Sequence, residues 1–226
     1  MKTLAPILLL LLVVSTSWGQ LTPEQHTRLV KYSRWLGAQN ICYNENWLPP
    51  NQSQSWTMDC SNTSRYLYET LFHIHLPRTA SDQYVALEKA GRVHSVPLRW
   101  DGSIDTPALL NELRSGDLLF WENTYNVKRD PPVSHVMIYL GQTAEHVPMM
   151  FGSSSGAEGE HSHHGGVDVY VFRPNAPCGG TSAFFGFIPL ERGKFIGFAR
   201  PILQPIPPPP PQVALTPSLP HGNTTN

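Results

Sequence analysis

The stretch WTMDCSNTSRYLY, residues 56–68, predicts the start of a helix with a reactive side chain in its first turn. Asp59 is a favoured N-cap residue, because its carboxylate can accept a hydrogen bond from a free amide of that turn. Apolar side chains follow at helical spacing, at Tyr66, Leu67, Leu71 and Phe72. The positive end of a helix dipole favours a thiolate over a thiol, and a thiolate beside a base is a nucleophile. Cys60 is therefore the candidate nucleophile.

The candidate base lies in the stretch VSHVMIYLG, residues 133–141, which predicts a strand. Side chains alternate along a strand, so one face carries Val136, Ile138 and Leu140 and the other carries His135, Met137 and Tyr139. His135 is thus off the most apolar face, and it sits near the start of the strand, where a side chain can reach a cleft. We interpret it as the general base.

These two stretches belong to a set of motifs that occurs in a fixed order. The set comprises Asp59–Ser61, Leu76–Gln83, Gly116–Trp121, Ser134–Gly141 and a closing Phe195–Arg200. In this set the sequence resembles the NlpC/P60 family of cysteine peptidases, which have a papain-like fold. The resemblance covers roughly residues 25–202.

The resemblance implies a role for several side chains. Cys60 would attack an amide carbonyl, and His135 would take and return the proton. Asp59 and Ser61 would help to recognise the polar end of a peptide. Two further residues are assigned to substrate binding: Tyr43, the nearest match to a tyrosine that lines the family's site, and Ser134. The implied substrate is peptidoglycan, cleaved in its stem peptides, commonly at D-glutamyl–diamino acid bonds.

The third residue of the family's catalytic set has no obvious counterpart. Phe151 takes the place of the polar residue that orients the imidazole, and a phenyl ring cannot hold an imidazole by hydrogen bonding. His164, or else His163, is the nearest substitute in the sequence. The alternatives are a Cys60–His135 dyad or a degenerate site.

The rest of the chain predicts an α+β fold with N-terminal helices packed on an antiparallel sheet. Helix starts are predicted at Thr22-Pro23, at Thr79 or Ser81, and at Thr106-Pro107. Strands follow at Leu118–Trp121, Val133–Leu140, Val147–Phe151, Val167–Phe172 and Phe195–Ala199. Helices first and strands after favour this class over alternating α/β units. The loop Glu122–Pro132 directly precedes His135 in the sequence and is expected to rim the cleft.

The two ends of the chain differ in composition from its middle. Residues 1–19 have the positive start, apolar core and small-residue end of a signal peptide, and the apolar run is shorter than the roughly 20 residues of a membrane span. We therefore expect a secreted protein (periplasm, cell wall or extracellular) with no stable membrane span. Residues 20–204 form the predicted catalytic domain, and residues 205–226 a Pro-rich, disordered tail. A net charge of −1 implies no nucleic-acid partner.

Three cysteines, an odd number, leave at least one thiol unpaired within an exported chain. The resemblance requires Cys60 to be free, and Cys42–Cys178 is then a candidate disulfide. A Cys42–Cys60 bridge is the alternative, and it would abolish catalysis. His161, His163 and His164 lie in a Gly-rich loop without an accompanying carboxylate or Cys cluster, so no metal and no other cofactor is predicted.

The predicted function is that of a secreted cysteine peptidase or amidase that hydrolyses amide bonds in peptidoglycan stem peptides. Two other classes stay open. One is a non-catalytic module that binds cell-wall peptides in the same cleft. The other is an acyltransferase or a lipid-directed hydrolase on the same scaffold.

Overall fold

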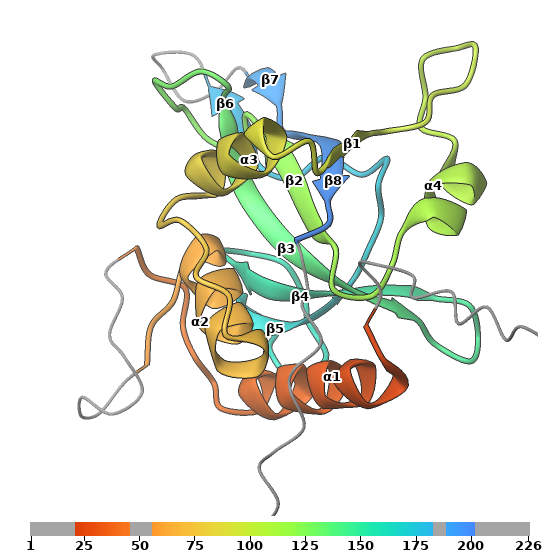
Figure 1. Ribbon diagram of the computed structural model, residues 1–226. Coiled ribbons are helices and arrows are strands. Elements are labelled where there is room, and N and C mark those ends of the chain that lie inside the picture. Colours follow the sequence, from red (N-terminus) through yellow and green to blue (C-terminus); the bar gives the residue numbers. More distant parts are fainter. Residues whose placement is uncertain (1–20, 46–55, 183–188, 202–226) are drawn as a thin grey trace, which may run out of the picture.

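The computed structural model describes residues 21–45, 56–182 and 189–201, and the predicted signal peptide and tail lie outside these ranges. Four helices pack against a six-stranded antiparallel sheet (Figure 1). The helices are α1 (Pro23–Gly37), α2 (Cys60–Phe72), α3 (Ala80–Lys89) and α4 (Thr106–Glu112). The predicted α+β class is confirmed. None of the helices in the described ranges is long and apolar enough to cross a bilayer.

The sheet places the last described strand, β8, between two strands that come earlier in the chain. Its order is β1-β8-β2-β3-β4-β5, and every neighbouring pair is antiparallel. The strands are β1 (Val93–Ser95), β2 (Leu118–Glu122), β3 (Val133–Gln142), β4 (Pro148–Ser154), β5 (Gly166–Val171) and β8 (Lys194–Ala199). A separate pair joins β6 (Gly180–Ser182) to β7 (Pro189–Arg192). The five predicted strands are present within a few residues of their expected ends. The sequence did not predict β1, β6 and β7.

The helices begin where side-chain caps are available. Thr22 and Gln25 form the reciprocal capping box of α1, and the Asp59 carboxylate accepts the Asn62 amide at 2.7 Å at the start of α2. Thr79 caps α3, whereas α4 is capped by Asp105, one residue before the predicted start. Each such cap contributes on the order of 1 kcal/mol to helix stability.

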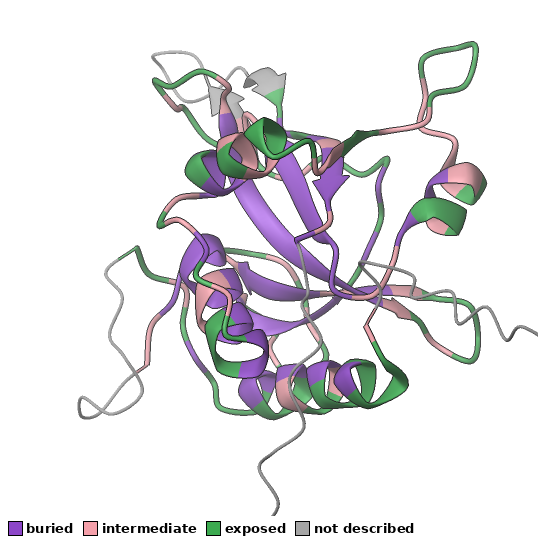
Figure 2. Cartoon of the chain, viewed as in Figure 1, coloured by how far each residue is buried: buried purple, intermediate pink, exposed green. Residues whose placement is uncertain are grey.

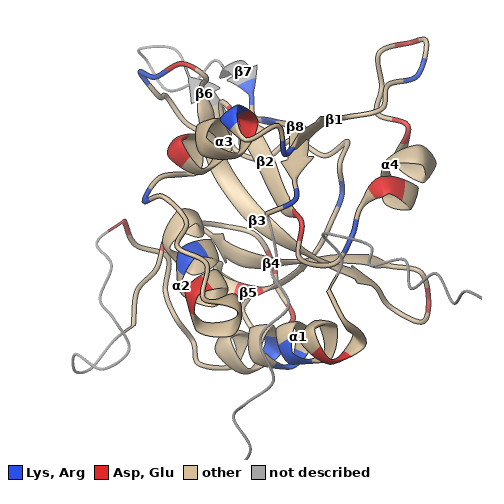
Figure 3. Cartoon of the chain, in the orientation of Figure 1, with Lys and Arg blue, Asp and Glu red and all other residues tan. Residues whose placement is uncertain are grey.

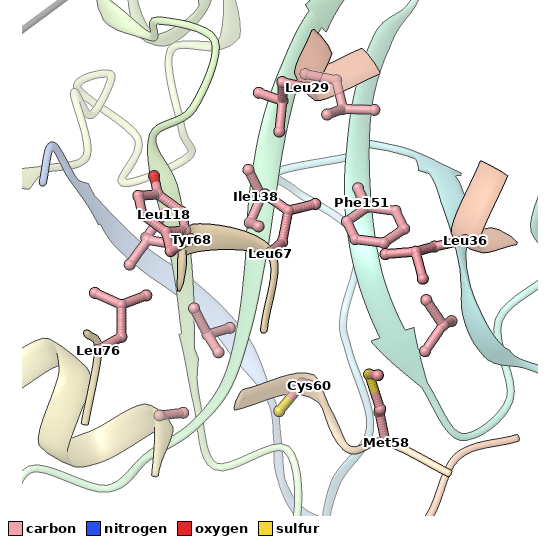
Figure 4. Packing of buried hydrophobic residues seen from close by; sticks show 14 of the residues in the cluster. Leu29, Leu36, Met58, Cys60, Leu67, Tyr68, Leu76, Leu118, Ile138 and Phe151 are labelled. Atoms are coloured by element: carbon pink, nitrogen blue, oxygen red, sulfur yellow. The ribbon is translucent and has the colours of Figure 1, made fainter. Parts of the chain in front are cut away.

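Two hydrophobic clusters lie on opposite faces of the sheet, because successive strand residues alternate between them. On one face, side chains of α1–α3 pack against the sheet, including Leu29, Leu36, Leu67, Tyr68, Leu118, Ile138 and Phe151 (Figure 4). The other face carries a largely aromatic cluster with Leu109 and Leu113, including Trp121, Tyr139, Phe172, Phe195 and Phe198. Both faces of β2 and β3 are therefore buried, as Figure 2 shows for the central strands.

Two of the sequence motifs meet in a buried ion pair. Asp117, from Gly116–Trp121, is 1% exposed and binds Nε and Nη2 of Arg200, from the closing motif, at 2.9 Å each. Burial raises the pKa of Asp117, and Arg200 opposes the rise. The pair joins the start of β2 to the end of β8, so these two motifs have a structural role.

Candidate active site

The first turn of helix α2 lies against strand β3. This places Cys60 next to Val136, the residue that follows His135. The backbone amides of Val136 and Ser61 lie close enough to the Cys60 sulfur to lower its pKa. The side chain is 5% exposed and lies at the margin of the helix-side cluster (Figure 4). Amides aimed at a sulfur stabilise negative charge there, as a nucleophilic thiol requires.

His135 projects from the other face of β3, into a cleft of about 690 Å³. The imidazole is 8% exposed and packs edge-on against Trp121, with the ring centroids 5.5 Å apart. Trp121 pairs directly with His135 across the β2–β3 ladder. The ring is therefore held by aromatic packing.

Cys60 lines a hollow of about 380 Å³ that adjoins the cleft of His135. Four residues line both hollows: Tyr43, Glu45, Tyr125 and Ser134. A peptide lying over this shared wall would face the sulfur on one side and the imidazole on the other. The structure thus places the two predicted catalytic residues in two hollows that share part of their lining.

Burial keeps both groups neutral in the unliganded site. It raises the pKa of Cys60 to about 12, with Asp59 adding to the rise and the two amides opposing it. It also lowers the pKa of His135 to about 4, with Asp59 opposing. The sequence predicted a depressed thiol pKa, and this is wrong for the resting structure, because the loss of water outweighs the helix N-terminus. A nucleophilic attack by Cys60 would therefore have to be coupled to the loss of its proton.

This neutral state gives a measurable expectation for alkylation. At pH 8 a thiol with a pKa of about 12 is ionised in on the order of one molecule in ten thousand, far less than an ordinary thiol with a pKa of about 8.5. We expect iodoacetamide to modify exposed Cys42 well before Cys60 in reduced protein, read from peptide masses. The Cys60 rate should climb steadily above pH 9. Preferential labelling of Cys60 at pH 6–7 would show a preformed thiolate instead.

Asp59 and Ser61 are both engaged by Arg78, to which the sequence assigned no role. Arg78 binds the Asp59 carboxylate at 2.7 Å and donates to the Ser61 hydroxyl at 2.9 Å. The Ser61 hydroxyl in turn donates to Asp59 at 3.1 Å. These residues line the hollow of Cys60, so a ligand there meets a neutralised carboxylate. Gln83, from the same motif as Arg78, donates to the Ser61 carbonyl at 3.1 Å.

Ser134 and Tyr43 are also at the site. The Ser134 hydroxyl accepts the Thr124 amide at 2.8 Å and bonds the Thr124 hydroxyl at 2.8 Å, so it anchors the loop between β2 and β3. Tyr43 lines both hollows, and burial followed by the nearby Cys60 raises its pKa. The loop contributes Tyr125 and Arg129 to the wall, and sequence reasoning singled out neither.

Phe151 does not lie where the sequence alignment put it. It pairs with Ile138 across the β3–β4 ladder, three residues from His135, so strand alternation sends its side chain to the opposite face. Figure 4 shows it packed with Ile138 and Leu36 in the helix-side core. Gly152, its neighbour, is the residue that faces Met137 on the side of the imidazole. The expectation that Phe151 occupies the orienting position is therefore wrong.

His164 lies in a different hollow from His135. It is exposed and lines a pocket that shares Tyr43 and Ser155 with the cleft of His135, but it does not line that cleft itself. His163 pairs instead with Glu158 at 3.2 Å. In the described ranges no hydrogen bond joins a side chain to the His135 ring, so neither histidine of this loop serves there as the predicted third residue.

Asp168 has a structural role in the histidine-rich loop. Buried Asp168 accepts the amides of His161 and Ser162 and contacts the His161 ring at 2.9 Å, which holds the histidine-rich loop. Within the described part of the chain, no group of three or more His, Cys, Asp or Glu residues is placed to hold a metal ion. All three cysteines are free thiols in this structure, and the Cys42–Cys178 disulfide stays a prediction for the oxidised protein.

Comparison with known proteins gives one family match. The model described as NlpC/P60 family matches residues 48–164, just over half of the chain. Among solved structures, the chain is similar to a lipoprotein-like protein of the NLP/P60 family from Staphylococcus aureus, with 19% sequence identity and a TM-score of 0.41. That alignment covers 80% of this chain and 44% of the other, so this chain spans less than half of its length. The search of curated proteins returned no match.

Proposed function

The chain belongs to the NlpC/P60 family, and we propose that it is a secreted cysteine peptidase that hydrolyses amide bonds in peptidoglycan stem peptides. Most members of this family are cysteine peptidases. The observation that carries the proposal is the joined pair of hollows that Cys60 and His135 line, with two backbone amides aimed at the sulfur.

In the proposed reaction, the Cys60 sulfur attacks the amide carbonyl while its proton passes to His135. The carbonyl oxygen becomes an oxyanion, which the backbone amide of Cys60 at the helix start can stabilise. The imidazolium then protonates the leaving amine as the carbon–nitrogen bond breaks, leaving a thioester. A water molecule gives its proton to His135 and attacks the thioester, which releases the acid and restores the thiol.

The neutral resting pair fits this sequence of proton transfers. A bound peptide excludes the remaining water and supplies an electrophile, so charge develops on the sulfur only as the new bond forms. His135 is deprotonated above about pH 4 and is therefore available as a base across the neutral range. The peptide would be framed by Tyr43, Asp59, Ser61 and Ser134. Arg78 lines the same hollow and pairs with Asp59 at 2.7 Å.

A non-catalytic binding module is the second candidate function. It is favoured by the His135 ring, which lacks a hydrogen-bonding partner among the described side chains and packs edge-on against Trp121. Such a protein would hold the same peptide in the same cleft without turnover.

Incubation with purified peptidoglycan and with a synthetic stem tetrapeptide separates these functions. A peptidase releases fragments whose masses match cleavage of one amide bond, together with one new amine for each bond cut. A binding module retains the peptide, measured by calorimetry, and releases no amine over a long incubation. That second result would overturn the proposed hydrolysis.

A further inference from the structure

We propose that the cleft of His135 selects an apolar side chain on the residue that supplies the amine of the scissile bond. The inference rests on the proposed peptidase function and adds a substrate class to it. Amides with an apolar amine-side residue would be preferred, and a diamino acid in that place would be disfavoured. Met150 and Ala157 are the residues to which we assign this preference.

The lining of the cleft changes in character along its length. At one end it shares four side chains that carry polar groups with the hollow of Cys60: Tyr43, Glu45, Tyr125 and Ser134. Elsewhere it shares three apolar residues and one arginine with a third hollow, of about 520 Å³: Met150, Ala157, Val171 and Arg173. This third hollow and the hollow of Cys60 have no lining residue in common. We call the part of the cleft with the second set its far end.

The far end is the accessible edge of a hydrophobic cluster. Met150 and Ala157 are partly buried and pack against the aromatic cluster on this face of the sheet. The exposed Pro177 also lines the cleft. Figure 3 shows that β3 and β4 carry no Lys, Arg, Asp or Glu. An apolar ligand that covers such surface removes it from water, which is favourable.

Gly152 keeps the floor beside the imidazole apolar. Met137 lies two residues from His135 on the same face of β3 and lines the same cleft. A Cβ atom at Gly152 would collide with the Met137 sulfur, so glycine at this position allows the thioether to lie against β4. The surface next to His135 is therefore formed by a methionine.

The proposed reaction assigns the amine half of the substrate to this cleft. After the attack, the acyl half is bonded to the Cys60 sulfur and stays at the hollow that Cys60 lines. The imidazolium of His135 has to reach the leaving nitrogen in order to protonate it. The amine half therefore extends into the cleft that His135 lines, and its side chain meets the far end.

The charges of the cleft disfavour an ammonium group at the far end. Among the described residues, two charged ones line the cleft: Glu45 and Arg173. Glu45 belongs to the wall shared with the hollow of Cys60, whereas Arg173 belongs to the far end. The side-chain ammonium of a diamino acid would lose water beside methionine side chains, and the arginine at that end has the same sign of charge. An uncharged alkyl chain incurs neither cost.

The test uses two peptides that differ by one ammonium group. Both have a γ-D-glutamyl acyl half, and the amine-side residue is lysine or norleucine, which has the same four-carbon chain without the terminal amine. We expect kcat/KM of the wild type to be at least about tenfold higher on the norleucine peptide. Met150→Ala should lower kcat/KM on that peptide by about 3- to 10-fold, because it removes apolar contact, and change the lysine peptide by less than about twofold.

Ala157→Glu is the variant that should reverse the preference. It adds a carboxylate at the far end, which attracts the ammonium of lysine and makes the site unfavourable for norleucine. The ratio of kcat/KM for the two peptides should shift toward lysine by about 10- to 100-fold. Glu158→Gln is the matched control: it alters the charge of the next residue in the same loop, but Glu158 does not line the cleft, so the ratio should change by less than about twofold.

Two results would overturn the proposal. One is a wild type that prefers the lysine peptide. The other is an equal response of both peptides to Ala157→Glu, because it would mean that the substitution only disturbs the loop. Circular dichroism and thermal unfolding check that each variant is folded.

A binding experiment separates this proposal from the proposed hydrolysis. The two peptides are titrated by calorimetry into Cys60→Ala and into Cys60→Ala/Ala157→Glu. Tighter binding of the norleucine peptide that is lost in the double variant supports the apolar site even if the wild type cuts neither peptide. Equal affinity of Cys60→Ala for both peptides would overturn it, whatever the outcome for hydrolysis.

Discussion

Replacing Cys60 with Ala is expected to lower kcat on a cell-wall peptide by at least about a thousandfold, with peptide affinity kept within a few-fold. The sulfur forms the covalent intermediate, so its loss removes the chemical step rather than a binding contact. Stopped assays of released amine give kcat, and calorimetry gives affinity. Cys178→Ala is the matched control, because its thiol lines the cleft of His135 without reaching the hollow of Cys60, and it should keep activity within about threefold.

The double variant Cys60→Ala/His135→Ala sharpens this result. Two residues that act as one unit give losses that do not add, so the double variant should be no slower than Cys60→Ala alone. Residual turnover in Cys60→Ala that falls further when His135 is removed would instead indicate that the histidine activates water directly. Circular dichroism at equal concentration checks that all variants are folded.

Replacing Arg200 with Ala is expected to lower the free energy of unfolding by about 3–5 kcal/mol, because it leaves the Asp117 carboxylate buried without a counter-ion. Asp117 is 1% exposed. Without Arg200 its carboxylate would keep the hydrogen bond from the Arg114 backbone amide, at 2.8 Å. Urea unfolding measures the change. Adding Asp117→Asn should recover part of the loss, since a neutral amide needs no counter-ion.

Arg34→Ala supplies the control for this measurement. Arg34 also donates through two nitrogens to a carboxylate, that of Glu160, with both distances 3.1 Å. The Arg34 side chain, however, is 50% exposed. Solvent weakens such a pair, and we expect a loss below about 1 kcal/mol. Similar losses for Arg34→Ala and Arg200→Ala would contradict the importance of burial.

The elements that the sequence predicted well are those with local signals. Thr22, Asp59 and Thr79 cap helices through bonds to residues three positions along. The strands β2 and β3 carry their own apolar pattern. The short strands β1, β6 and β7 have little pattern of their own, because their pairing depends on residues far along the chain. Local propensity contains no information on such partners.

The site was predictable in its two central residues and not in its surroundings. The alignment of Phe151 failed because the β3–β4 register shifts between Tyr139 and Gly141, and a shift of one residue exchanges the faces of a strand. The pKa of Cys60 depends on how much of the fold covers it, which the helix-start pattern does not encode. Arg78 and Arg129 come from segments whose approach to Cys60 is a matter of tertiary structure.

The position of β8 in the sheet bears on how the nascent chain can fold during synthesis. Strand β8 lies between β1 and β2, and Arg200 pairs with Asp117 across 83 residues of chain. Before Lys194 has been synthesised, β1 and β2 of the growing polypeptide each have an unpaired edge, and Asp117 lacks its counter-ion Arg200. Such edges invite pairing with other chains. Translation therefore has to run almost to the end of the domain before the sheet can close, and a stop codon shortly before β8 should yield aggregates rather than a smaller folded protein.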